Sequence, residues 1–137
     1  MDYQLTLVEK PGYLHAIATG SNSRETVALY LMQGLKECEA RGCRRVLIES
    51  RLEGPRLPPW DTFEIASWHA RLDQGIFDAI AYVDAKAPAD MLDFVENVTS
   101  SRGLPLRVFP SAAAAEQWLA STLDEANAPP AMTGQNA

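Results

Sequence analysis

The sequence predicts an α/β domain with a five-stranded mixed sheet and about four helices. Short apolar runs bounded by turn residues recur along the chain, as expected of strands that are covered by helices. Amphipathic stretches of helical length separate most of these runs. Residues 101–119 show the unit most clearly, because a helix stop, a short apolar strand, a tight turn and an alanine-rich helix follow one another there.

The first two strands are predicted to form a hairpin. Residues 3–8 alternate weakly between apolar and polar side chains, and residues 13–19 make a second strand-like run. The Pro11-Gly12 pair between them is typical of a turn. We expect these strands to pair antiparallel and the later strands to run parallel to the second, because crossovers of helical length separate them.

A helix is predicted over residues 24–41. Ser23 precedes it as an N-cap residue, and Gly42 follows it where a left-handed C-cap residue is common. The predicted buried face consists of apolar or small residues at helical spacing: Val27, Leu31, Gly34, Leu35 and Cys38.

The remaining elements alternate. The predicted strands cover residues 45–49, 77–83 and 106–109, and the glycine and prolines of residues 51–60 predict a loop. Three helices are predicted: residues 61–72, a helix that Pro88 opens and Gly103 terminates, and a last helix capped by Ser111. The buried residues of the last two are predicted to be Met91, Phe94, Val95 and Val98, and then Ala115, Trp118 and Leu119.

The helix over residues 61–72 carries two apolar stripes. The first stripe is Ile65, Trp68 and Leu72, and the second is Phe63, Ala66 and Ala70. A helix that lies on a sheet buries one stripe fully, so the other meets the preceding loop, a neighbouring helix, a ligand or a second subunit.

Length and composition predict one domain over residues 1–123 and a disordered tail over residues 124–137. The net charge of -6 argues against a general nucleic-acid-binding surface.

The chain has no apolar run of about 20 residues and no signal-peptide pattern, so a cytoplasmic protein without a membrane span is predicted. Cys38, Cys43, His15 and His69 fit no metal-ligand spacing, and no metal or cofactor is predicted.

The predicted order of elements, with Arg107-Val108-Phe109 followed by AEQWL at 115–119, resembles the SpoIIAA-like group of STAS (anti-sigma-factor-antagonist-type) domains. The runs GCRRVLIES and FDAIAYV fall where that family has its central strands, and the resemblance covers about residues 3–123. It implies a β-α superhelix in which a hairpin strand lies beside four mostly parallel strands, with helices largely on one face.

The resemblance also implies a position for phosphorylation. In regulatory STAS proteins, a partner kinase phosphorylates a serine in an Asp-Ser-Ser-Gly-type motif at the start of the helix after the third strand. Asp61 and Thr62 stand at the matching position, but the second serine and the glycine are missing and Glu64 adds negative charge. We therefore predict that Thr62 is not an effective phosphorylation switch, and that Asp61 or a neighbour caps the helix.

Candidate catalytic residues lack the neighbours that catalysis requires, so the sequence predicts no enzyme. Ser50 ends a strand, but it has no G-x-S-x-G context and no nearby histidine. His69 is expected at the boundary of the core. Glu49, Asp61 and Glu64 are expected to be solvated carboxylates rather than an acid pair across a pocket.

The sequence thus predicts a non-catalytic regulatory or interaction domain that acts by protein–protein binding, including a homodimer. The second helix and the loop before it supply the predicted interface: Trp60, Asp61, Thr62, Ile65, Trp68 and Leu72. The alternative is a binder of a small apolar molecule or lipid in a pocket beside the proline-rich loop, since CRAL-TRIO-type lipid carriers use the same overall topology. An enclosed apolar cavity of several hundred Å³ favours the ligand binder, whereas an exposed apolar patch favours the interaction domain.

Overall fold

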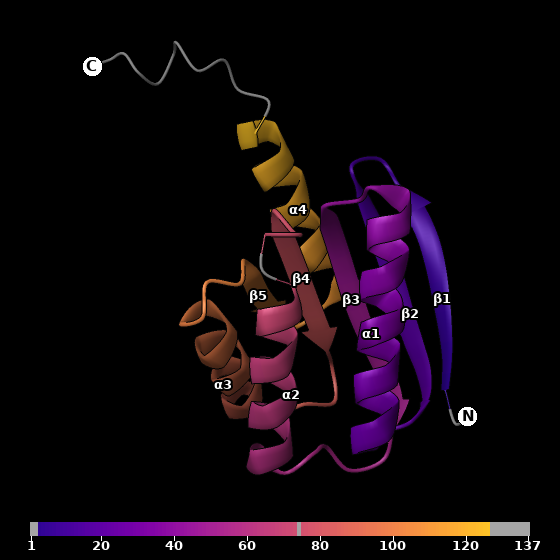
Figure 1. The fold of residues 1–137 in the computed structure, drawn as a ribbon, viewed down its shortest axis with the longest axis vertical. Coiled ribbons are helices and arrows are strands. Elements are labelled where there is room, and N and C mark those ends of the chain that lie inside the picture. The colour runs from indigo at the N-terminus through magenta and orange to yellow at the C-terminus, as the bar shows by residue number, and fades with distance from the viewer. Residues whose placement is uncertain (1–2, 74, 127–137) are drawn as a thin grey trace.

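The computed structural model describes residues 3–73 and 75–126. The chain folds as an α/β structure with a five-stranded mixed sheet and four helices, which confirms the predicted fold class (Figure 1). In chain order the elements are β1 (Tyr3–Lys10), β2 (Tyr13–Ser21), α1 (Arg24–Arg41), β3 (Arg45–Glu53), α2 (Pro59–Leu72), β4 (Ala79–Asp84), α3 (Ala89–Ser100), β5 (Leu106–Phe109) and α4 (Ala112–Ala126).

The strands lie in the sheet in the same order as in the chain. β1 and β2 pair antiparallel, with Leu5 opposite Ala18. The remaining pairs are parallel, as predicted, with Val46 of β3 between Leu14 of β2 and Ile80 of β4.

Helices cover both faces of the sheet. α1, α2 and α3 lie side by side on one face, and α4 lies behind β3 and β4 on the other (Figure 1). Alternation along β4 divides its residues between these layers. Ile80 belongs to the core under α1 and α2, whereas Ala79, Ala81 and Val83 belong to the core under α4.

The predicted ends of α1 are confirmed. The Ser23 hydroxyl oxygen accepts a hydrogen bond from the backbone N–H of Thr26 at 3.1 Å. Gly42 ends the helix in the left-handed conformation, at φ +66°, which side chains disfavour. Cys38 is buried as expected, and Val27 and Leu31 are half-buried.

The segment between β3 and α2 is shorter than predicted. β3 continues to Glu53, and α2 already begins at Pro59, because a proline is well accommodated in the first turn of a helix. The predicted cap was therefore wrong: Pro58 is the N-cap residue and makes no side-chain cap, while Asp61 lies within the first turn.

Two predicted core residues are more exposed than expected. Phe94 is 36% exposed, because α3 turns Leu92 and Thr99 towards the interior together with Val98, whose predicted burial is confirmed. Trp118 is half-buried, and its ring centroid lies 5.4 Å from that of Phe109.

α4 continues through residues 124–126, which the sequence pattern assigns to the tail. The rest of the predicted tail, residues 127–137, lies outside the described residues.

Candidate functional site

The predicted interface residues all belong to α2, but they point in different directions. Trp60 is 67% exposed and stacks on Phe63, with ring centroids 6.0 Å apart. Trp68 is half-buried and Leu72 is 37% exposed. We call the group of Trp60, Phe63 and Trp68, which line one surface hollow, the α2 apolar surface.

Charged side chains border the α2 apolar surface. Arg24 of α1 pairs with Asp61 at 2.7 Å and with Glu64 at 2.6 Å, and so ties α1 to the start of α2. The guanidinium of Arg102 lies 5.3 Å from the centroid of the Phe63 ring, which is within range of a cation–π contact. Arg24, Arg102 and the exposed Arg71 border a wide surface hollow of about 640 Å³ on this side of the molecule.

Thr62 and Ile65 face inwards. The hydroxyl of Thr62 donates to the backbone carbonyl of Pro58 at 3.1 Å, and the residue is only 6% exposed. Ile65 is 7% exposed and lines a cavity beneath the helix. Both side chains are therefore buried, unlike that of Trp60, although Ile65 also reaches the floor of the surface hollow that Trp60 lines.

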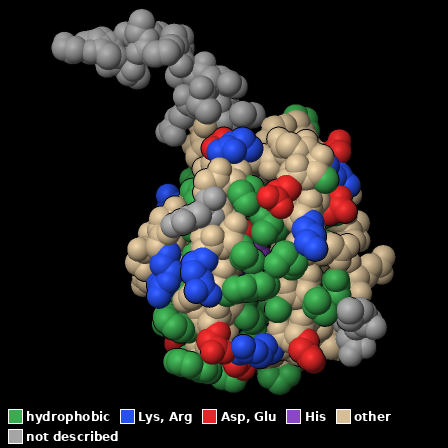
Figure 2. Space-filling view, viewed as in Figure 1, with side chains coloured by type: hydrophobic (Ala, Val, Ile, Leu, Met, Phe, Trp, Pro, Cys, Tyr) green, Lys and Arg blue, Asp and Glu red, His purple; other side chains and the backbone are tan. Residues whose placement is uncertain are grey.

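The cavity beneath α2 has a volume of about 80 Å³. α1, α2 and α3 and the facing side of the sheet enclose it, and its walls are mostly apolar. In Figure 2, hydrophobic side chains gather along the seam between α1 and α2. The volume is below the roughly 300 Å³ at which drug-sized ligand pockets begin.

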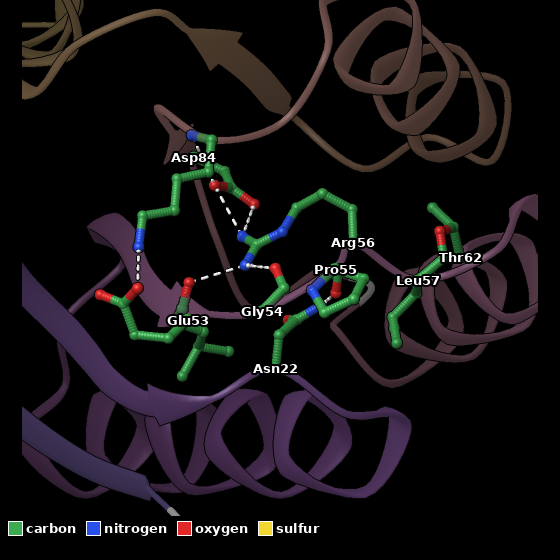
Figure 3. A network of polar contacts seen from close by, with 10 residues as sticks. Asn22, Glu53, Gly54, Pro55, Arg56, Leu57, Thr62 and Asp84 are labelled. Carbon is green, nitrogen blue, oxygen red and sulfur yellow. Dashed lines mark hydrogen bonds and ion pairs between the residues drawn. The ribbon is translucent and has the colours of Figure 1, made fainter.

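A buried ion pair closes the end of the cavity near the carboxyl ends of β3 and β4. Nη1 of Arg56 donates to both carboxylate oxygens of Asp84, at 2.9 and 2.7 Å, and the two side chains are 9% and 3% exposed. Nη2 of Arg56 donates to the backbone carbonyls of Leu52 and Gly54, at 2.6 and 3.0 Å. Figure 3 shows the guanidinium between Asp84 and this turn, so one side chain fixes the β3–α2 segment to β4.

A second buried polar pair lies at the other end of α2. Nδ1 of His69 is hydrogen-bonded to Oδ2 of Asp73 one turn further along, and the residues are 8% and 1% exposed. Both residues line the cavity. Nε2 of His69 and Oδ1 of Asp73 are buried without a hydrogen-bond partner among the described residues. His69 therefore lies inside the core, and its predicted position at the boundary was wrong.

Two neighbouring tyrosines, Tyr30 and Tyr82, lie close enough to Asp84 for its charge to affect their pKa values. Burial raises the pKa of Tyr30 to about 12. Burial, with the neighbouring Tyr30 and Asp84, raises the pKa of Tyr82 well above its ordinary value. Both phenols therefore stay neutral to a higher pH than an ordinary tyrosine does.

A separate polar cluster lies on the opposite face of the sheet. Nε2 of His15 and Oε1 of Glu49 are 2.9 Å apart, and Nε of Arg51 donates to Oε2 of Glu49, also at 2.9 Å. Burial opposes ionisation of Glu49, but the hydrogen bonds from Arg51 and His15 outweigh it and lower the pKa of this carboxyl. The sheet separates Glu49 from Asp61 and Glu64, so the three carboxylates do not form one acid cluster.

The two buried pairs were missed at the level of sequence, although each leaves a signal. His69 and Asp73 are four residues apart, which places them on one helix face. Asp84 follows Ile80 and Tyr82 at a spacing of two, which places it on the same face of β4. No spacing in the sequence brings Arg56 to Asp84.

Among residues 3–73 and 75–126, no group of three or more His, Cys, Asp or Glu side chains is arranged to hold a metal ion. None of the helices in that part of the chain is long and apolar enough to cross a membrane. Comparison with known protein families and with curated proteins finds no match to this chain. The resemblance to STAS domains therefore stays a prediction that rests on the order of elements.

Proposed function

We propose that this chain is a non-catalytic interaction domain whose partner is a second copy of itself, bound through the α2 apolar surface. The exposure of Trp60 carries the proposal. A tryptophan that is 67% exposed leaves a large apolar ring in water. Apolar surfaces of this kind on soluble proteins commonly mark interfaces, in which tryptophan and arginine are enriched.

The backbone beneath Trp60 is stiff. Pro58 and Pro59 directly precede it, and their rings fix the φ angles at the start of α2. The stacking of Trp60 on Phe63 restricts the indole further. The surface therefore has little conformational entropy left to lose on binding, which favours association.

The charges around the surface favour a second copy as the partner. The chain carries a net charge of -6, which opposes self-association in general. Around the α2 apolar surface, however, Arg24, Arg71, Arg102 and Glu64 line one hollow, and Arg24 also pairs with Asp61. A two-fold axis can place arginines of one copy against carboxylates of the other, as an isologous interface requires.

Sedimentation equilibrium at micromolar concentrations tests this proposal. We expect the parent protein to show a dimer mass and Trp60→Glu to show a monomer mass with an unchanged circular dichroism spectrum. Leu29→Glu is the matched control, because Leu29 is also an exposed apolar residue, at 42%, but does not belong to the α2 apolar surface. A parent that remains monomeric up to several hundred micromolar, or a Trp60→Glu variant that dimerises as the parent does, overturns the proposal.

A further inference from the structure

The outer edge of β1 is open to a further strand. β1 is the first strand of the sheet, and no other strand of the described residues pairs with its far side (Figure 1). Its register with β2 is unbroken by a bulge, and β1 contains no proline. The charged residues of β1, Glu9 and Lys10, are confined to one end. Native proteins usually protect such an edge, because its unpaired backbone groups can bind another strand.

The opposite edge of the sheet has the protection that β1 lacks. β5 has only four residues, and one of them is the charged Arg107. The carboxylate of Glu96, on α3, accepts a hydrogen bond from the backbone N–H of Val108 at 3.2 Å. A strand added beside β5 would have to displace this carboxylate. Of the two edges, β1 is therefore the one that favours strand addition.

The turn between β1 and β2 determines which backbone groups of β1 point outwards. Lys10 and Tyr13 flank a two-residue turn and form the first pair of the ladder. Such a turn is closed by a hydrogen-bonded pair, and hydrogen-bonded and non-hydrogen-bonded pairs then alternate along an antiparallel ladder. The even-numbered residues of β1 therefore bond to β2. The backbone groups of the odd-numbered residues point outwards: Tyr3, Leu5, Leu7 and Glu9.

A second copy of β1 complements this edge. With a two-fold axis at Thr6, Leu5 lies opposite Leu7 of the other copy, and Tyr3 lies opposite Glu9. All outward-pointing residues of both strands then form hydrogen-bonded pairs, and no charged side chain meets a like charge within them. An axis at Leu7 instead would place Tyr3 opposite Pro11, which has no backbone N–H.

The helices leave room for this pairing. α1 lies over β1 and β2, whereas α4 lies on the other face, over β3 and β4. Neighbouring strands are about 4.8 Å apart, so the two copies of α1 would lie about two strand spacings, or roughly 10 Å, from each other. That is an ordinary distance between packed helices.

We propose that β1 is a second self-association surface, at which two copies pair their β1 strands antiparallel about a two-fold axis at Thr6 and join their sheets into one. β1 and α2 lie on opposite sides of α1, so this contact is separate from the α2 apolar surface (Figure 1). Water already hydrates an open edge, so each new hydrogen bond gains little. We therefore expect a dissociation constant on the order of 0.5 mM, too weak to form at micromolar concentrations.

Amide exchange with solvent, measured by NMR on the Trp60→Glu variant, tests the proposal without the α2 contact. Between about 20 µM and 2 mM protein, a dissociation constant of about 0.5 mM predicts roughly threefold slower exchange at the amides of Leu5 and Leu7. The amides of Thr6 and Val8 are the internal control, because they already bond to β2. We expect their exchange to be independent of concentration.

Substitutions at Thr6 test the position of the axis. Thr6 is exposed, and the axis places it opposite its own copy with Cβ atoms about 5 Å apart. Thr6→Lys and Thr6→Glu, each added to Trp60→Glu, are both expected to abolish the slowing, although one lowers and the other raises the net negative charge. An equimolar mixture of the two is expected to restore it. Thr19→Lys is the matched control, because Thr19 is exposed on the same face but belongs to β2, and it should behave as the unsubstituted strand does.

Unchanged exchange at Leu5 and Leu7 up to 2 mM overturns the proposal, whether or not the parent protein dimerises through α2. Equal slowing at Thr6 and Val8, or a mixture of the two Thr6 variants that shows no recovery, also overturns it. If a Thr6 variant does not fold, the contrast between the two sets of amides in the unsubstituted strand decides the question.

Discussion

Replacement of Arg56 by methionine tests whether the buried ion pair holds the β3–α2 segment in place. Methionine keeps the length of the apolar stem and removes the guanidinium, so Asp84 is left 3% exposed without its counter-charge. The backbone carbonyls of Leu52 and Gly54 lose their donor at the same time. The perturbation therefore leaves buried polar groups unpaired while it changes side-chain volume little.

The expected loss follows from the geometry. Opposite charges about 4 Å apart attract by about 4 kcal/mol at an effective dielectric constant of 20. Removal of one member of a buried pair typically costs about 3–5 kcal/mol, because the other charge stays buried. This is a large part of the roughly 5–15 kcal/mol that stabilises a typical domain.

Urea unfolding measures the effect. With an m-value of about 2 kcal/mol/M, a loss of about 4 kcal/mol lowers the midpoint by about 2 M. Arg44→Met is the matched control, because Arg44 pairs with Asp78 at 3.0 Å but both side chains are more than half exposed, at 53% and 58%. Solvent screens that pair, so we expect no resolvable change in its midpoint.

The double variant Arg56→Met/Asp84→Leu separates the pair from the packing around it. It removes both charges, and we expect it to recover most of the lost stability. The reasoning is refuted if Arg56→Met unfolds at the same urea concentration as Arg44→Met, or if the double variant is less stable than Arg56→Met alone.

Four further predictions concern other parts of the molecule. The pKa of Glu49 is lowered in the folded state, so ionised Glu49 contributes stability above its unfolded pKa of about 4.5. This contribution is lost as the pH falls through the folded pKa. The urea midpoints of Glu49→Gln and the parent should therefore converge at acid pH. Burial, with the hydrogen bond to Glu116, raises the pKa of Tyr13 to about 12. Neutral Tyr13 therefore contributes stability below about pH 10, and this stability is lost between about pH 10 and 12. In alkaline melting curves, Tyr13→Phe should lose less stability over this pH range than the parent. Trp118→Ala should lower the free energy of unfolding in urea by about 2–3 kcal/mol. This is less than the roughly 3–5 kcal/mol of a fully buried tryptophan, because Trp118 is half-buried. A variant as stable as the parent would contradict the packing described for Trp118. Thr62 should remain unmodified in a kinase reaction followed by intact-mass spectrometry, because its hydroxyl is buried and bonded to Pro58, and stoichiometric phosphate on Thr62 contradicts this.

Local signals explain why the fold was predictable. Ser23 and Gly42 mark the two ends of α1 through backbone chemistry that acts within a few residues. The Pro11-Gly12 turn joins β1 and β2 directly, and so short a connection leaves antiparallel pairing as the accessible arrangement. The periodicity of the later segments identifies alternating strands and helices, and crossovers of helical length favour parallel strands.

The candidate site was less predictable because it depends on contacts between distant segments. Trp60 was expected at a surface from its place after two prolines, and it is exposed. Ile65 was grouped with it through the stripe that it forms with Trp68 and Leu72, and Thr62 through the resemblance to STAS domains. Both residues are buried and line the cavity, because successive helix residues point in different directions. The pair of Arg56 and Asp84 joins residues 28 positions apart, and only the parallel β3–β4 crossover brings them together.

The order of the strands in the sheet has a consequence for how the chain is made. Each hydrogen-bonded strand pair is also consecutive along the chain, so the sheet can grow at one edge in the order of synthesis. α4, which covers Leu47, Ala81 and Val83, follows the last strand. A nascent chain that ends at β5 therefore exposes the apolar face of the sheet that α4 later covers. A chaperone at the ribosome exit would bind that face before α4 packs against it.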